Sequence, residues 1–272
     1  MVRPDDAIVF RKAVLGFYAR EGRLFPWRNI DDPWAILVSE LMLQQTQTSR
    51  VEPKYRAWME RFPDAASVAA ADLATIYEAW RGLGYNSRAL RLRESARICA
   101  EHYRGVPPQD ERLLLALPGV GRYTARAVLA FAYGVPSAFL ETNIRAALIL
   151  HFFPGIEKVR DRDLEAAAQA VLDQGDPRTW YYALMDYGAW LKKHEPNPSR
   201  KAAGYTRQSK FQGSLRQVRG AVLRAVSEQG PVTLGYFAAE SGIEYGRLRS
   251  AAEALSRDGL VVLEDDVVRF AD

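Results

Sequence analysis

Glu40 is an isolated acid in an otherwise apolar stretch of the sequence, PWAILVSELMLQQT (33–46). Val38 lies two positions before it, and Leu41 follows it directly. If a helix buries this side chain, the loss of water disfavours the ionised form and raises the pKa of the carboxyl group, which suits a general acid. A glutamate on the solvent side of the helix fits the same letters, so its burial decides between the two interpretations.

A second stretch, LPGVGRYTA (117–125), predicts an anion site at a tight turn between two helices. Gly119 and Gly121 permit backbone angles and close approaches that a side chain would forbid. The first N–H groups of the following helix point outward, and with the helix dipole they attract a phosphate. Arg122 adds positive charge beside them. An ordinary turn between helices, with glycine ending the first, explains the two glycines equally well.

The elements that position these stretches are predicted to be helices, because apolar residues recur at helical spacing through about the first 200 residues. Proline or glycine closes most of these segments, as is usual at helix ends. Strand-like alternation is scarce in this region, which indicates an all-α fold. The predicted helices are 7–21, 33–46, 51–62, 72–83, 88–103, 111–117, 122–134, 162–175 and 177–194.

The composition changes near residue 195. From 192 to 224 the sequence has nine Lys or Arg and one acid, Glu195, and we predict a basic linker over 196–213. Three short helices and two alternating strands follow over 214–272, in an order that resembles a winged helix. Winged helices bind DNA or dock proteins, so the pattern does not choose between these roles. The elements are predicted at 214–230, 233–242, 244–259, 260–264 and 266–271, with Asp265-Asp266 as the turn between the strands.

The composition also excludes several classes of protein. Of the 272 residues, 48% are hydrophobic, which is enough for a sizeable core. The single cysteine, Cys99, excludes a disulfide framework or an all-cysteine metal site within one chain. The net charge of +4 slightly favours polyanionic partners. The sequence lacks a signal-peptide core or an apolar run of membrane-spanning length, so we expect a cytoplasmic protein, associated with the nucleoid in a prokaryote.

Segments in a fixed order carry a resemblance to a known family. The series resembles the MutY-type adenine DNA glycosylases of the helix-hairpin-helix superfamily over residues 8–192, and SELMLQQTQ is its most MutY-like part. The resemblance implies a glycosylase core over 1–195, with a six-helix subdomain at about 29–136 and a second helical subdomain formed by 1–28 and 137–195. Besides the turn at 117–125, the segments are PWR (26–28), PWAILVSELMLQQTQTSRVEPKY (33–55), WRGLGYNSRALRL (80–92), FLETNIRAALI (139–149) and ALMDYGAW (183–190).

This resemblance implies an enzyme that flips a base out of duplex DNA and hydrolyses its N-glycosidic bond. Glu40 matches the acid that protonates the adenine. Glu141, in LETN, stands where the family has an aspartate that stabilises the sugar cation or activates the nucleophile. Its extra methylene means that the site accepts glutamate or that the activity is altered, while a simple acid at a helix N-terminus is the alternative. Asn143 matches an asparagine that orders this site.

Other positions carry implied contacts. Tyr123 occupies the position where bifunctional relatives have a lysine nucleophile, and a tyrosine cannot form a Schiff base, so we predict a monofunctional enzyme without a lyase step; packing over the turn is its alternative role. Gln44, Gln45 and Tyr85 match side chains that enter the duplex beside the flipped base, although exposed helix ends also explain the glutamines. Further predicted DNA contacts are Arg28, Arg88, Gly119, Val120, Gly121, Arg122, Thr124 and Arg145.

The sequence departs from the family at two places. Typical members hold an iron–sulfur cluster with four cysteines after the MDxGA segment, but WLKKHEPNPSRKAAGYTRQS (190–209) has none. We therefore predict no cofactor beyond a non-catalytic monovalent cation at the hairpin, and we hypothesise that the basic segment organises a DNA-contacting loop in place of the cluster. Typical members also carry a Nudix-like domain that recognises 8-oxoguanine, which residues 214–272 do not resemble.

Three functions remain open at this point. The first is a monofunctional mismatch glycosylase that excises adenine opposite guanine or 8-oxoguanine, which Glu40 favours because adenine needs a proton donor to leave. The second is a thymine, uracil or modified-pyrimidine glycosylase acting on mismatches with guanine. The third is a catalytically weak binder of mismatches or lesions, which the Glu141 departure supports. In each case the partner is double-stranded DNA containing a mismatch or lesion, and we expect a monomer.

Overall fold

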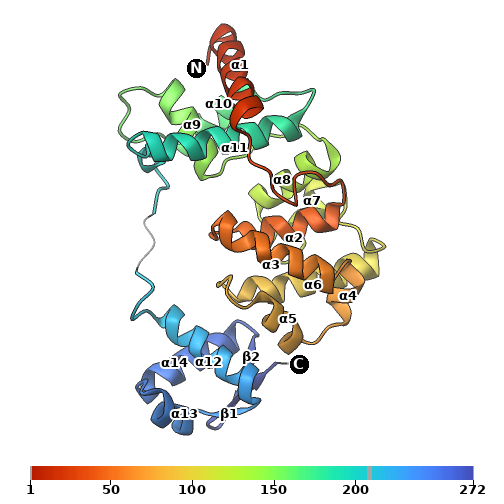
Figure 1. Cartoon of the computed structure of the whole chain (residues 1–272), viewed down its shortest axis with the longest axis vertical. Helices are drawn as coiled ribbons and strands as arrows, with labels where there is room; N and C mark the ends of the chain where they lie inside the picture. The colour runs from red at the N-terminus through yellow and green to blue at the C-terminus, as the bar shows by residue number, and fades with distance from the viewer. Residues whose placement is uncertain (1, 207–209, 272) are drawn as a thin grey trace. The chain divides into compact units, whose positions relative to one another are not determined.

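The computed structural model describes residues 2–206 and 210–271, and these are mostly helical, with a small sheet near the C-terminal end (Figure 1). They form two compact units. The first contains residues 1–40, 107–116 and 120–207, and the second contains residues 41–106, 117–119 and 208–272. The predicted helical fold class is confirmed, but this grouping differs from the predicted domain boundaries.

The first unit is helical and has an aromatic core. Phe131 stacks on Tyr182 and Phe139 stacks on Tyr181, with ring centroids 4.4 and 3.8 Å apart. The central helix of this core, α11, packs against both α9 and α1. The helices of the unit are α1 (Pro4–Glu21), the first part of α2 (Pro33–Leu43), α7 (Glu111–Leu115), α8 (Arg122–Tyr133), α9 (Thr142–Phe152), α10 (Asp161–Val171), α11 (Pro177–His194) and the 3-10 helix η1 (Pro198–Lys201).

The second unit begins with four helices that surround buried tryptophans. Trp58 and Trp80 meet edge to face, with ring centroids 5.7 Å apart. One of the four, α4, was not predicted, because six residues are too short to show a helical period; Asp64 and Ser67 define it through a capping box. The helices are α3 (Thr48–Arg61), α4 (Ala65–Ala70), α5 (Leu73–Trp80) and α6 (Ser87–His102).

The C-terminal part of the second unit has the helix–strand–helix–helix–strand–strand order of a winged helix. Its sheet is antiparallel with the order β1-β3-β2. The predicted turn between the last two strands is confirmed, with Asp265 at φ 53°. The first strand was missed, because two residues carry no alternation. The elements are α12 (Leu215–Gln229), β1 (Val232–Thr233), α13 (Leu234–Ser241), α14 (Tyr245–Arg257), β2 (Val261–Glu264) and β3 (Val267–Phe270).

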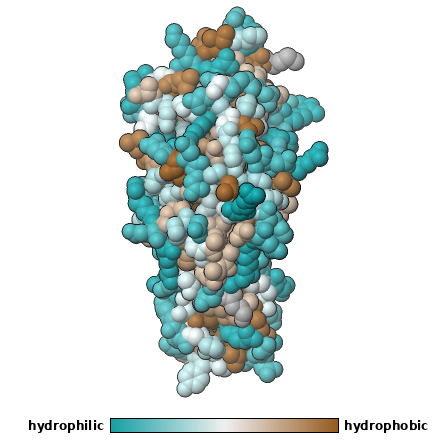
Figure 2. Space-filling model, turned by 90° about the vertical axis from the view of Figure 1, so that its right-hand side faces the viewer, coloured by the Kyte–Doolittle hydropathy of each residue, from teal (hydrophilic) through white to brown (hydrophobic). Residues whose placement is uncertain are grey.

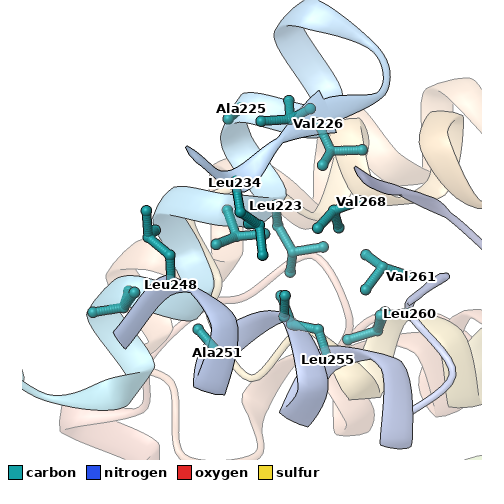
Figure 3. Close-up of a cluster of buried hydrophobic side chains, with 14 of the residues drawn as sticks. Leu223, Ala225, Val226, Leu234, Leu248, Ala251, Leu255, Leu260, Val261 and Val268 are labelled. Carbon is teal, nitrogen blue, oxygen red and sulfur yellow. The ribbon is translucent and has the colours of Figure 1, made fainter. Parts of the chain in front are cut away.

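The core of this C-terminal part includes side chains from α5. Figure 3 shows Leu223, Leu255 and Val268 converging from α12, α14 and β3. Leu73 and Tyr77 of α5 belong to the same buried cluster. Because residues distant in the sequence share one apolar core, the C-terminal part is held against α5 and does not form a separate compact unit.

The surface of the protein is mixed in character. On the face in Figure 2, hydrophobic residues form small separate groups among hydrophilic ones. None of the described helices has the combination of length and apolar composition that a membrane crossing requires.

Candidate active site

Glu40 is buried near the end of the apolar helix α2, with 4% of its surface exposed. The structure therefore favours the first interpretation of this residue over a glutamate on the solvent side. The hydroxyl of Tyr123, in the first turn of α8, donates a hydrogen bond of 2.7 Å to Glu40 Oε2. The two residues joined by this hydrogen bond, Glu40 in the apolar stretch and Tyr123 just after the glycine turn, both lie in the first unit.

The surroundings of Glu40 bring the pKa of its carboxyl group close to neutral pH. Burial raises the pKa of Glu40 to about 7, the hydrogen bond from Tyr123 opposes this rise, and the negative charge of Glu141 adds to it. Burial also raises the pKa of Tyr123 well above its usual value, and the charges of both glutamates act in the same direction. Tyr123 therefore stays a neutral donor, while Glu40 can hold or release a proton near pH 7.

Glu141 caps the N-terminus of α9. Its Oε1 accepts hydrogen bonds from the backbone N–H groups of Asn143 and Ile144, at 2.7 and 2.8 Å, and its Oε2 accepts one from Asn143 Nδ2 at 3.1 Å. Burial raises the pKa of Glu141, while these two backbone N–H groups lower it. Glu141 is thus an acid at a helix N-terminus, which was the alternative to a catalytic role. Its negative charge also raises the pKa of Glu40.

A glycine on α11 sets the position of this cap. A Cβ atom on Gly188 would lie 2.0 Å from the backbone oxygen of Asn143, so only glycine lets α11 approach the start of α9 so closely. This contact fixes the segment that carries Glu141 and Asn143. Gly188 belongs to the ALMDYGAW segment that carried part of the family resemblance, but the sequence did not show that it packs against the backbone of Asn143 on α9.

Arg28 is part of a buried ion pair, which corrects its prediction as a phosphate contact. Its Nη1 and Nη2 each donate to the carboxylate of Asp186 at 2.8 Å, and its guanidinium lies 4.6 Å from the centre of the Tyr182 ring. Arg23 donates to the same carboxylate at 2.6 Å. Since only 6% of the Arg28 side chain is exposed, a DNA phosphate has little access to it. Its charge instead lowers the pKa of Glu40.

The prediction of Arg88 as a DNA contact is also corrected, because the residue is 4% exposed and lies in the interior of the second unit. Burial lowers its pKa to about 10, which leaves it charged at pH 7. Its guanidinium binds the last carbonyls of α2 and the loop before α6, so it ties together the two loops that contain Gln45 and Tyr85. The groups that accept its hydrogen bonds are the backbone oxygens of Leu41, Met42, Gln44, Leu83, Gly84 and Tyr85 and the hydroxyl of Thr46.

The two loops held by Arg88 have strained backbones. Gln45 and Tyr85 have φ values of 55° and 48°, in the left-handed region that non-glycine residues rarely adopt. Such strain is found preferentially at functional sites. Gln45 is exposed and Tyr85 half-buried, while Gln44 donates to the backbone oxygen of Gly119 at 3.2 Å. All three residues predicted to enter DNA thus lie in the second unit.

The hairpin has the predicted close approach at Gly119, but Gly121 has φ −90° and open space where a Cβ would lie, so its backbone does not require glycine. Gly119 has φ 82°, and a Cβ atom there would lie 3.1 Å from the Cβ of Arg91. Gly121 is the N-cap of α8, and the Arg122 side chain that follows is 63% exposed, 3.9 Å from Glu165. The exposed side chain of Arg122 is therefore accessible to a DNA phosphate.

Three other predicted DNA contacts are less accessible. The side chains of Val120 and Thr124 are buried, which corrects their prediction as side-chain contacts; only backbone groups remain for DNA there. Arg145 is half-buried and pairs with Asp161 at 3.0 Å. Sequence reasoning therefore placed the hairpin correctly in the chain but could not tell which of its side chains point inward.

Comparisons with known proteins agree with this fold. The family model of the HhH-GPD superfamily of base excision DNA repair proteins matches residues 38–174. A relative from Mycolicibacterium smegmatis named adenine DNA glycosylase is 36% identical, and the match covers 91% of each chain. A relative from Methanothermobacter thermautotrophicus named thymine/uracil-DNA glycosylase is 30% identical, with 68% of this chain and 87% of the relative covered.

A solved structure gives the same result. The structure of a thermostable thymine-DNA glycosylase superposes with a TM-score of 0.63 at 29% identity, over 68% of this chain and 87% of the other. The predicted superfamily is thereby confirmed, and the activity class is that of a DNA glycosylase of base excision repair. The chain belongs to the HhH-GPD superfamily of base excision DNA repair proteins.

Proposed function

We propose that this protein is a monofunctional adenine DNA glycosylase that acts on adenine opposite guanine or 8-oxoguanine. The observation that carries this proposal is the buried Glu40, whose pKa is raised to about 7 beside Tyr123 and Glu141. The adenine-named relative from Mycolicibacterium smegmatis supports it, because the match covers 91% of both proteins. A protein of nearly this length carries that name, so the departure from the Nudix-like pattern does not weigh against adenine.

The geometry supports a two-carboxyl mechanism. Protonated Glu40 donates its proton to a ring nitrogen of the flipped adenine, and the electron pair of the breaking C–N bond leaves with the neutral base. The carboxylate of Glu141 stabilises the positive charge that develops on the sugar. Water then forms the new bond to the sugar carbon, and its proton returns to a carboxylate. Tyr123 holds Glu40 in place and supplies no amine, so no Schiff base forms.

A pyrimidine substrate is the second candidate. The relative named thymine/uracil-DNA glycosylase and the solved thymine-DNA glycosylase both favour it. A pyrimidine leaves as a stabilised anion and depends less on a proton donor, so a buried acid with a raised pKa is better matched to adenine. A catalytically weak lesion binder is the third candidate, and turnover alone separates it from the other two.

Substitution of Glu40 tests the mechanism. We expect Glu40→Gln to abolish excision of adenine in single-turnover assays while the variant still binds the mismatched duplex. The exposed Glu60 provides a matched control, and Glu60→Gln should excise at the rate of the unmodified protein. Full activity in Glu40→Gln would refute the general-acid role, and absence of excision by the unmodified protein on every duplex would favour the binder.

The residues present do not fit an iron–sulfur cluster. The single cysteine, Cys99, is buried in α6, so four thiolate ligands are absent from the chain. Backbone contacts organise the segment after α11 instead: Val159 N–H donates to the Lys201 oxygen at 2.8 Å, and Ala203 N–H donates to the Val159 oxygen at 2.7 Å. A monovalent cation at the hairpin stays a prediction.

We further propose that this basic segment contacts DNA. Lys193 and Arg200 are exposed on either side of the buried Ser199 and Pro198. Replacing both cations with alanine should reduce the salt dependence of DNA binding, since each phosphate contact releases counterions. An unchanged dependence of the dissociation constant on salt would contradict this proposal. Arg207, in the same segment, lies outside the described residues.

A further inference from the structure

The C-terminal part of the second unit contacts one of the residues predicted to enter DNA. Arg216, in the first turn of α12, donates from Nη1 to the hydroxyl of Tyr85 at 3.3 Å. The ring of Tyr85 also lies 5.5 Å from the guanidinium carbon of Arg88. Tyr85 is therefore held between an arginine of the helical region and an arginine of the winged-helix-like region.

This contact belongs to a packed interface. The rings of Tyr77 on α5 and Phe270 on β3 lie 5.6 Å apart, and both are part of or packed against the shared apolar core. An ion pair of 2.9 Å between Arg81 and Glu228 lies between α12 and the residue after α5. The start of α12 is thus placed beside Tyr85 by side-chain packing along its length.

The charges of the C-terminal part are unevenly distributed. Residues 210–271 contain eight Lys or Arg and eight Asp or Glu, so the region as a whole has a formal net charge of zero. The turn between β2 and β3 is acidic, with Glu264, Asp265 and Asp266 in succession. A phosphate backbone repels such a tip, so entry of this wing into a DNA groove is unfavourable.

Positive charge gathers instead at the start of α12. Lys210 is exposed just before it, Arg216 is half-buried in its first turn, and Arg247 of α14 donates to the Gly213 backbone oxygen at 2.7 Å. We call these three cations the α12 basic patch. The guanidinium of Arg216 carries a positive charge next to the Tyr85 hydroxyl, so it attracts a phosphate that lies beside this tyrosine.

We propose that the α12 basic patch, through Arg216, binds a DNA backbone phosphate beside the step into which Tyr85 inserts. The inference rests on the proposed function and on the prediction, drawn from the family resemblance, that Tyr85 enters the duplex. DNA carries one negative charge per roughly 1.7 Å of helix axis, so a cation touching an inserted side chain lies close to a phosphate. The winged-helix-like region then contributes to DNA binding through the start of its first helix and not through its wing.

The test measures how salt weakens binding of the full-length protein to a duplex with a tetrahydrofuran abasic-site analogue. Arg216→Ala should weaken binding and reduce the slope of log K against log salt concentration by about 1. Arg269→Ala is the matched control, because it removes one positive charge from β3 next to the acidic wing. This control should leave the slope unchanged. An unchanged slope in Arg216→Ala, or an equal reduction in Arg269→Ala, would overturn the proposal.

A second variant separates phosphate binding from the positioning of Tyr85. Arg216→Gln keeps a donor for the tyrosine hydroxyl but removes the charge, so its slope should fall as in Arg216→Ala. Recovery of the full slope by glutamine would contradict a phosphate contact. The analogue needs no excision, so these results do not depend on which base is removed. Adenine excision with an unchanged slope would refute this inference alone, whereas a reduced slope without adenine excision would refute the proposed substrate alone.

Discussion

Replacing the general acid should stabilise the folded protein at alkaline pH. Glu40 is 4% exposed, and its pKa rises from 4.5 to about 7 on folding. The folded state therefore keeps a proton that the unfolded state loses as the pH rises between these values, and stability falls across that window. At pH 8 the accumulated penalty is roughly 3 kcal/mol, at 1.36 kcal/mol per pKa unit. Glutamine has the same shape, can accept the hydrogen bond of Tyr123 and carries no charge.

The assay is thermal or urea unfolding of the full chain at pH 5 and pH 8. We expect Glu40→Gln to be more stable than the unmodified protein at pH 8, by up to roughly 3 kcal/mol or several degrees in Tm, with little difference at pH 5. Glu60→Gln, at an exposed position, should show no such pH dependence. Lower stability of Glu40→Gln at pH 8, or a difference that does not change with pH, would refute the burial and ionisation argued for Glu40.

The remaining predictions concern activity and packing. Single-turnover excision should decline as pH rises through about 7, because Glu40 loses its proton there; a rate that keeps rising to pH 9 would contradict this. Gly188→Ala should lose both stability and activity through a clash with the Asn143 backbone, whereas Gly220→Ala, in open space on α12, should be neutral or stabilising in the same melting assay. Arg88→Ala should cost roughly 3 kcal/mol or more in urea unfolding by leaving buried carbonyl groups unpaired, and a loss below 1 kcal/mol would show that the two loops do not depend on it.

Local patterns predicted the parts of this protein that depend on neighbouring residues. The glycines at 119 and 121 indicated a tight turn, because that signal lies within neighbouring residues, whereas the apolar run around Glu40 fitted both a buried and a solvent-facing acid. The strands at the C-terminal end were visible through alternation and the Asp265-Asp266 turn.

Features that depend on distant residues were not visible. Arg28 and Arg88 were predicted to bind phosphate because a sequence shows their charge but not their burial. Asp186, which pairs with Arg28, lies 158 positions away. The packing of the C-terminal part on Leu73 and Tyr77 likewise joins segments that share no local pattern.

The most direct test of the central claim is identification of the base released from a panel of duplexes. The panel pairs adenine with 8-oxoguanine and guanine, and pairs thymine and uracil with guanine, under single-turnover conditions with mass detection of the free base. The structure predicts release of adenine, with strand breakage only after added alkali. Release of thymine or uracil without adenine would contradict the assignment of Glu40 as the proton donor that selects the substrate.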